Sequence, residues 1–205
     1  MKGLFNTMFN AWRVPELRKK LLFTLFILAL YMIGGLIPTP GMDAEKFHEL
    51  VKGWGQIGSL MDIISAGGLY SATIFAMGIT PYINSSIIMQ LLTVAIPALE
   101  RLQKEGETGR KKIQQIVRVV TVVLALTQAS VFTYATRSAM TGYIAKPVNA
   151  VLIIMTFTAG TAFIMWLGER INDKGIGNGI SLLIFAGIVT RIPTMAESLY
   201  KYALE

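Results

Sequence analysis

The stretch that decides the fold is GITPYINSSIIMQLLTVAIPA (residues 78–98), followed directly by LERLQKEGETGRKK (residues 99–112). The first part is an uncharged and mostly apolar run, close to the ~20 residues that a helix needs to cross a bilayer. The second part carries five basic residues, and Lys and Arg gather on the cytoplasmic side of membrane proteins. We therefore expect a membrane span that ends in the cytoplasm, at Arg101, Lys104, Arg110, Lys111 and Lys112.

The composition extends this expectation to the whole chain. Of the 205 residues, 53% are apolar and 15% are charged, whereas about a quarter of the residues in a soluble domain are charged. The apolar residues gather in runs of nearly bilayer length, and a soluble protein with buried helices would have little chain left to cover them. The net charge of +7 comes from basic residues between the runs, which is typical of membrane orientation rather than of a nucleic-acid interface.

The apolar runs predict five spans, at about residues 21–37, 78–98, 115–135, 148–168 and 179–197. The basic N-terminal segment, residues 1–20, is expected in the cytoplasm. The first run is expected to stay as an anchor rather than to be cleaved as a signal peptide. The last run is short, because its uncharged part makes only about 18 Å of helix. To cross the membrane, this helix must continue past Arg191 and Pro193.

Residues 57–77 are long enough to cross the membrane but are not expected to do so. The N-terminal segment and residues 99–112 are both expected in the cytoplasm, so an even number of spans must separate them. The first two apolar runs already supply that even number. We therefore predict a short re-entrant element at about residues 57–74, shielded from lipid by protein or water. Residues 42–56 and 137–147 are then expected outside.

No catalytic motif is found in the sequence. It holds no Walker loop, dinucleotide fingerprint, zinc spacing or Ser/His/Asp arrangement, so we expect no enzyme, no cofactor and no metal site. The glycine-rich stretch GIGNG (residues 175–179) lacks the lysine and the preceding strand of a phosphate loop, and indicates a flexible start of a helix. The spans hold no ionisable group at mid-depth, which favours a passive path over an ion-coupled transporter. A small secondary transporter and a membrane anchor subunit are the alternative functions.

Two groups of residues are candidates for the functional site. Ile79, Ile83, Ile87 and Gln90 fall on one face of the second predicted span. The alternative is ordinary packing between membrane helices, where small polar side chains are common. The second group is WLGERI (residues 166–171), just before the glycine-rich stretch, and its alternative is a charged helix end at the membrane interface.

At these residues the chain resembles the SecY family, the channel subunits of the general protein translocon. The resemblance runs from about residue 12 to the end of the sequence. Its longest matching stretches are FAMGITPYINSSIIMQLL (residues 75–92), EGETGRKKIQQ (residues 105–115) and WLGERINDKGIGNGISLLIFAGIV (residues 166–189). The shorter stretches IPTPGM and SAGGLYSATIF also fit the family.

The resemblance implies an all-α membrane protein: a five-helix transmembrane bundle with a re-entrant plug element, resembling one half of the SecY clamshell. The chain matches the N-terminal half, so the C-terminal half is expected as a partner that completes the channel. The predicted re-entrant element corresponds to the plug of the family, which seals the external funnel. The implied plug residues are Leu60, Ile63, Ser65, Gly67, Gly68 and Leu69, and the implied pore ring consists of Ile79, Ile83 and Ile184.

The resemblance also implies a function and a set of partners. Members of the family conduct unfolded preproteins with signal sequences across the cytoplasmic (inner) membrane and release membrane segments into the lipid bilayer. Apolar ring side chains bind no particular sequence, yet they hinder ions by dewetting when the pore is narrow. The implied protein partners are the small membrane subunits SecE and SecG, and the SecA motor or the ribosome. Arg110, Lys111 and Lys112 are expected either to dock such a partner or only to orient the helices.

Overall fold

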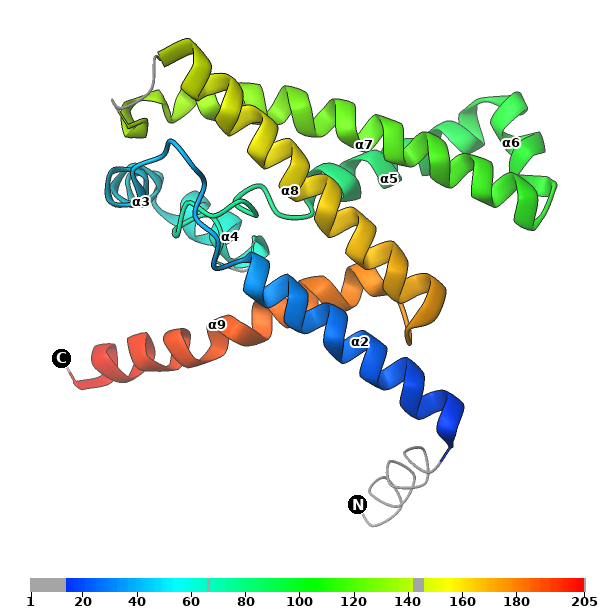
Figure 1. Ribbon diagram of the computed structural model, residues 1–205, viewed down its shortest axis with the longest axis horizontal. Helices are drawn as coiled ribbons and strands as arrows, with labels where there is room; N and C mark the ends of the chain where they lie inside the picture. The colour runs from blue at the N-terminus through cyan, green and yellow to red at the C-terminus, as the bar shows by residue number, and fades with distance from the viewer. Residues whose placement is uncertain (1–13, 66, 142–145, 205) are drawn as a thin grey trace.

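The computed structural model describes residues 14–65, 67–141 and 146–204 of the chain. Within these residues the regular structure is helical, apart from two isolated β-bridges. The α-helices of this part are α2 (Pro15–Gly34), α3 (Ala44–Gly53), α4 (Gln56–Ile64), α5 (Thr80–Ala95), α6 (Pro97–Lys104), α7 (Glu107–Ala135), α8 (Lys146–Lys174) and α9 (Gly179–Leu204), and a short 3-10 turn, η1 (Arg137–Ala139), follows α7 (Figure 1).

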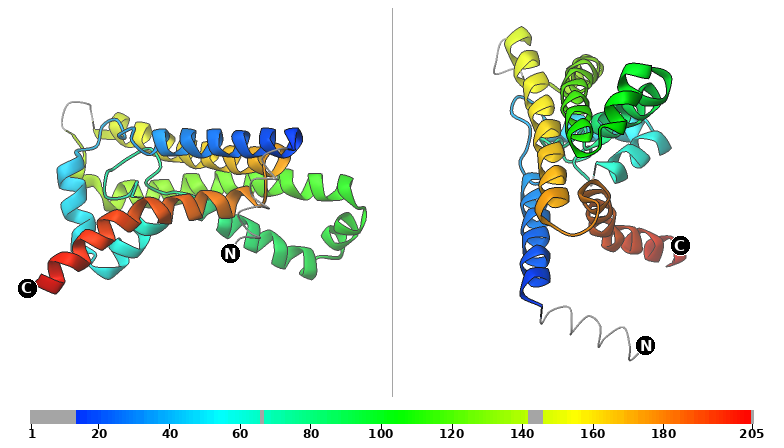
Figure 2. Two further views of the ribbon diagram at one scale, coloured as in Figure 1. Left: turned by 90° about the horizontal axis from the view of Figure 1, so that it is seen from below. Right: turned by 90° about the vertical axis from the view of Figure 1, so that its right-hand side faces the viewer.

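Two long helices, α7 and α8, run antiparallel and organise the fold (Figure 1). α8 packs against α7, α2, α9 and α5, and Figure 2 shows α2 and α8 side by side. In the most apolar stretch of α8, 44% of the residues are buried within the chain, against 28% for α7. α8 is therefore the central helix, whereas α7 leaves a broad apolar face uncovered.

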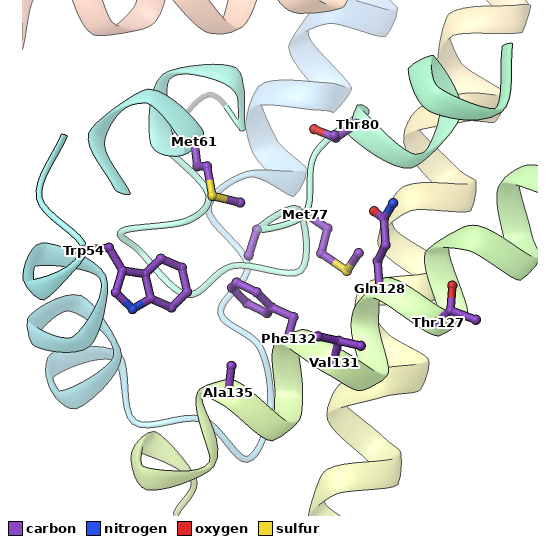
Figure 3. Close-up of a pocket in the computed structure, with 10 residues that line it drawn as sticks. Trp54, Met61, Met77, Thr80, Thr127, Gln128, Val131, Phe132 and Ala135 are labelled. Carbon is purple, nitrogen blue, oxygen red and sulfur yellow. The ribbon is translucent and has the colours of Figure 1, made fainter. Parts of the chain in front are cut away.

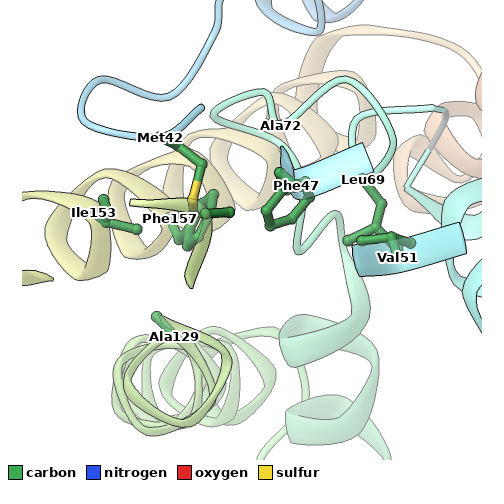
Figure 4. Close-up of a cluster of buried hydrophobic side chains, with 10 residues drawn as sticks. Met42, Phe47, Val51, Leu69, Ala72, Ala129, Ile153 and Phe157 are labelled. Atoms are coloured by element: carbon green, nitrogen blue, oxygen red, sulfur yellow. The ribbon is translucent and has the colours of Figure 1, made fainter. Parts of the chain in front are cut away.

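The two segments predicted to lie outside the membrane meet at one end of the bundle, which we call the α3 end. Met42 and Met140 form an antiparallel bridge, and the Asp43 amide donates to the Ala139 carbonyl at 2.8 Å. The Asp43 side chain caps α3 by accepting hydrogen bonds from the amides of the next helical turn. α3 buries Phe47 and Val51, one turn apart, against side chains of α7 and α8 (Figure 4).

The opposite end, which we call the α6 end, holds α6 and the turn between α8 and α9 (Figure 2). The Ile176 amide, in the turn between α8 and α9, donates to Thr24 Oγ1 of α2 at 3.1 Å. α8 and α9 approach so closely that a Cβ on Gly179 would collide with the carbonyl oxygen of Gly168. Gly168 of WLGERI and Gly179 of GIGNG are therefore needed for the close contact of the two helices.

The stretch predicted as a span at residues 78–98 is divided between two helices in the structure. It is not one straight helix, because α5 ends at Ala95 and α6 leaves it at an angle of 100°. Ile96 is extended (φ −109°, ψ 112°), as expected for the residue before a proline, and Pro97 starts the new helix. The second predicted span is therefore shorter than expected, and its last residues belong to α6.

By length and apolar composition alone, fewer helices qualify as membrane spans than the five predicted. Among the described residues, α7 and α8 are long and apolar enough, and α5 with α6 would make a third span if the bent pair counts as one. In α2 the first turns hold Arg18, Lys19 and Lys20, and the helix ends at Gly34, three residues before the predicted end. The uncharged part of α9 is only Gly179–Thr190, although its helix continues past Arg191 and Pro193 to Leu204.

Candidate functional site

The three isoleucines predicted to form a ring lie in one apolar cluster. Ile79 is the N-cap residue of α5 and is 4% exposed. Ile83 follows one turn later, and its amide donates to the Ile79 carbonyl at 3.1 Å. Ile83 and Ile184 of α9 are partly buried and pack against the cluster that contains Ile79. The fold thus joins side chains from α5 and α9 that are far apart in the sequence.

A small polar cavity of about 250 Å³ adjoins this isoleucine cluster. Ile83, Ile87 and Gln90 of α5 all line it, so the face predicted from their spacing is a real face of the helix. On the other side the wall comes from the α8–α9 turn and the start of α9. The polar residues of the lining are Tyr82, Ser86, Gln90, Asn172, Asn178 and Ser181.

The predicted re-entrant element consists of α4 and the irregular chain that follows it. Leu60 on α4 is 61% exposed, whereas Leu69 is fully buried in the cluster around α3. Ile63 is partly buried, and Ser65 is 4% exposed. The Ser65 hydroxyl accepts a hydrogen bond from the Leu69 amide at 3.0 Å. The residues implied to form one plug therefore divide into an exposed helix and a packed turn.

The two glycines of this element serve packing as well as bending. Gly67 has φ 83°, which a side chain would disfavour. A Cβ on Gly68 would lie 2.8 Å from Thr73 Oγ1 and 3.0 Å from the Phe75 carbonyl carbon. Both glycines are buried. Side chains at these two positions would therefore be opposed by the backbone angle at Gly67 and by the close approach of the chain to itself at Gly68.

The basic residues expected to dock a partner are exposed, but they do not lie in a loop. Arg110, Lys111 and Lys112 occupy the early turns of α7, and a tight turn at Gly106 (φ 77°) joins α6 to α7. Lys112 Nζ lies 3.8 Å from Glu105 Oε2. Cations near a helix N-terminus oppose the helix dipole, so helix stability does not explain them.

One functional candidate was missed from the sequence: an ion pair between α7 and α8. Arg118 Nε donates to Glu169 Oε1 at 2.7 Å, and Gln114 Nε2 lies 3.3 Å from the same oxygen. The Glu169 side chain is 5% exposed. The stretch WLGERI was noted as a charged helix end, but nothing local in the sequence identifies its partner.

A second missed feature is an apolar cavity of about 520 Å³ beside α4 (Figure 3). Met61, Met77 and Phe132 contribute large side chains to it, with Trp54 at one side. Its volume lies in the range of ~300–1,000 Å³ found for ligand pockets. The methionines are unbranched and adaptable, which suits a cavity that receives apolar groups of varied shape. In the described residues, no group of three His, Asp or Glu side chains could hold a metal ion.

Comparison with known proteins gives one consistent result. Residues 73–205 match the SecY family model. The protein translocase subunit SecY of Corynebacterium glutamicum is 43% identical over 201 residues, which cover 92% of this chain and 46% of that protein. The subunit of the same name from Bacillus subtilis (strain 168) is 42% identical over 204 residues, which cover 97% and 46%. The chain therefore spans about half the length of these curated relatives.

The fold is similar to solved structures of the same kind. The structure described as "The structure of a protein conducting channel" gives a TM-score of 0.60 at 25% identity, over 85% of this chain and 37% of that one. A structure concerned with the plug domain of the SecY protein gives a TM-score of 0.60 at 26% identity, over 85% and 36%. Sec61 in a canine ribosome-channel complex gives 0.55 at 25% identity, over 85% and 37%.

The helical architecture is similar to that of part of a protein-conducting channel. The chain belongs to the SecY family.

Proposed function

We propose that this chain is the N-terminal half of a bacterial SecY channel, which conducts unfolded secretory proteins across the cytoplasmic membrane and is not an enzyme. The observation that carries the proposal is the meeting of Ile79, Ile83 and Ile184 in one apolar cluster. Apolar side chains at a constriction fit around any polypeptide and hinder ions by dewetting. Membership of the SecY family sets aside the alternatives of a secondary transporter and a membrane anchor subunit.

The proposed topology has five crossings, by α2, α5, α7, α8 and α9, with the N-terminus in the cytoplasm. It draws support from the α3 end, where Met42 and Met140, from the two segments predicted outside the membrane, form a bridge. Residues 1–13 of the predicted cytoplasmic segment lie outside the described residues. The short uncharged parts of α2 and α9 then cross beside α8, which both helices contact.

In the proposed mechanism α4 is the part of the predicted plug that moves, and the chain does no chemistry. A partner pushes an unfolded polypeptide, α4 moves aside, and the isoleucines close around the polypeptide. Apolar segments leave sideways into lipid, driven by the transfer of their surface from water. The apolar cavity between α4 and α7 (Figure 3) is a suitable contact for such segments.

The proposed partners are those of the complete channel: the C-terminal half, SecE and SecG, and SecA or the ribosome at the α6 end. The uncovered apolar face of α7 supports a partner within the membrane. The exposed Arg110, Lys111 and Lys112 support a partner at the α6 end that carries negative charge.

Reconstitution tests the proposal. This chain is combined with SecE and with the C-terminal half of the Bacillus subtilis relative in proteoliposomes, and SecA and ATP drive an unfolded preprotein. The preprotein should become protected from external protease only when both halves are present. A preprotein with polar residues in place of its apolar signal segment is the control and should stay accessible. Assembled halves that give no protection would overturn the proposed function.

A further inference from the structure

Tyr70, which follows the buried turn of the re-entrant element, is contacted through every one of its polar groups. Its amide donates to Asp62 Oδ1 at 2.8 Å, and its phenol oxygen lies 3.0 Å from Ser59 Oγ. Its carbonyl oxygen lies 3.3 Å from His48 Nδ1, and the two rings make an edge contact at 5.0 Å. Ser59 and Asp62 belong to α4 and His48 to α3, so one residue is shared by both helices.

Tyr70 belongs to the fixed side of this contact. The chain just after it is held to the segment that follows α2, because the Thr39 amide donates to the Ala72 carbonyl at 2.8 Å and the Ile74 amide to the Ile37 carbonyl at 3.0 Å. The preceding residue, Leu69, is fully buried, and Tyr70 packs against the same cluster as α3. The frame around Tyr70 therefore stays in place if α4 moves.

α4 has the properties of the movable side. Its apolar side chains Ile57, Leu60 and Met61 are 67%, 61% and 43% exposed, so little apolar surface of these residues would be lost from the core by displacement. At its start, Gly55 has φ 60°, which allows a sharp change of direction. The polar contacts to Tyr70 therefore act together with the packing of α4 against α3 and α9 to hold α4 in place.

Asp62 is placed so that its contact with Tyr70 matters most. It is 3% exposed and lies in the last turn of α4, where the negative end of the helix dipole disfavours a carboxylate. Burial of a charge is also costly unless the charge is hydrogen-bonded. The Tyr70 amide contributes to offsetting these costs with a charge-assisted hydrogen bond, which is lost if α4 leaves the frame.

We propose that Tyr70 is a latch that holds the plug closed, through Asp62 and Ser59 of α4. This inference rests on the proposed function, in which α4 is the part of the plug that moves. The latch sets how often the plug leaves the pore without a substrate, so it is a positioning contact rather than part of the pore. Each contact is modest on its own, which allows an arriving polypeptide to break the set.

The latch is tested by measuring the open probability of the completed channel without a substrate, from single-channel recordings in planar bilayers. Tyr70→Phe and Ser59→Ala each remove the hydroxyl contact and should raise the resting open probability about 2–10-fold. The double variant should match either single variant, because both remove the same contact. Asp62→Ala should have a larger effect than Asp62→Asn, whose amide oxygen still accepts from the Tyr70 amide.

Matched controls remove exposed hydroxyls elsewhere. Tyr134→Phe on α7, where Tyr134 is 70% exposed, and Ser71→Ala, at an exposed serine next to Tyr70, should leave the resting open probability unchanged.

Two results would overturn the latch. One is an additive effect of Tyr70→Phe and Ser59→Ala on the resting open probability, and the other is a lowered Tm of these variants with an unchanged resting open probability. Deletion of residues 60–68 separates the two claims. If the deletion raises the leak and the latch variants do not, α4 is a plug without this latch. If wild-type channel neither conducts nor transports, the proposed function fails and the latch falls with it.

Discussion

Glu169 on α8 accepts a hydrogen bond from Arg118 on α7 at 2.7 Å, across 51 residues of sequence. The two side chains differ in environment, because Glu169 is 5% exposed and Arg118 is 46% exposed. One turn before Arg118, Gln114 reaches the same carboxylate oxygen. Next to Arg118, the Val117 carbonyl accepts a hydrogen bond from Ser85 of α5 at 2.9 Å. These contacts join α5, α7 and α8 into one unit near the α6 end.

Loss of this ion pair should destabilise the chain. Glu169→Gln or Arg118→Gln should lower the free energy of unfolding by about 1–3 kcal/mol, as for a hydrogen bond to a charged group that is largely buried. The charge-reversed double variant, Arg118→Glu with Glu169→Arg, should recover part of this loss. Unfolding followed by circular dichroism in detergent measures it. Lys104→Gln is the control, because the Lys104–Glu100 pair is exposed on both sides and should contribute well under about 1 kcal/mol.

The proposed topology predicts a labelling pattern. The chain has no cysteine, so single cysteines report cleanly, and Lys46, Lys104, Ser138 and Asp173 are all exposed. Cysteines at Lys46 and Ser138, at the α3 end, should react with an impermeant thiol reagent added outside intact cells. Cysteines at Lys104 and Asp173, at the α6 end, should react only after lysis. External labelling at Lys104 would contradict the even number of crossings, and the re-entrant assignment with it.

The parts of the fold that could be predicted are those that local sequence determines. Apolar runs and the basic residues between them marked each long helix, because both features act within a single helix and its flanks. The break at Ile96 was missed although its signal was present: Pro97 moves the preceding residue out of helical geometry. The signal was overlooked because the apolar run at residues 78–98 continues on both sides of Pro97.

The contacts that build the site could not be predicted in the same way. Arg118 and Glu169 are on different helices, and the approach of one to the other depends on how α7 packs against α8. Tyr70 collects partners from α3 and α4 for the same reason. The isoleucine positions came from the resemblance to the SecY family, because periodicity alone placed Ile79 and Ile83 on one face and gave nothing about Ile184.

The exposed basic residues of α7 predict docking with salt dependence. In the completed channel, replacement of Arg110, Lys111 and Lys112 by Gln should weaken binding of SecA or the ribosome about tenfold at low salt, with a smaller effect at high salt. Membrane insertion should be unaffected. Replacement of the exposed Lys46 and Lys52, at the α3 end, is the control and should not change affinity. If the triple variant and the wild-type channel bind the partner with equal affinity at low salt, these residues do not dock it and only orient the helices in the membrane.

The close contact of α8 and α9 predicts a sharp sensitivity to side-chain size. A Cβ on Gly179 would collide with the Gly168 carbonyl, so Gly179→Ala should force the helices apart and cost about 1–3 kcal/mol of stability. It should also move Ile184 relative to Ile79 and so change the resting conductance. Gly53→Ala is the control, because nothing lies within 4 Å of a Cβ there. In α3 that change should be neutral or stabilising by up to about 1 kcal/mol. Thermal unfolding measures the two effects: Gly179→Ala should lower the Tm and Gly53→Ala should not.

The isoleucine cluster makes the sharpest prediction, because a pore position and a lipid-facing position respond to charge in opposite ways. A charge that faces lipid at mid-depth costs about 2.5–3.5 kcal/mol on the insertion scale and impairs membrane integration. A charge that faces a pore can stay hydrated. Ile79→Asp, Ile83→Asp and Ile184→Asp, each made in the completed channel, should therefore let ions leak through the closed pore. The variants at the partly buried Ile83 and Ile184 should also integrate normally.

The control for this experiment is Met155→Asp on α8, where Met155 is 58% exposed on the outside of the bundle. It should lower integration, measured by protease protection after membrane insertion, and leave the conductance of the inserted fraction unchanged. The three isoleucine variants and the Met155 variant thus separate membrane integration from ion conductance. A general loss of stability would change both of these measurements. If all three isoleucine variants behave like Met155→Asp, the cluster is ordinary packing between helices and the constriction lies elsewhere in the channel.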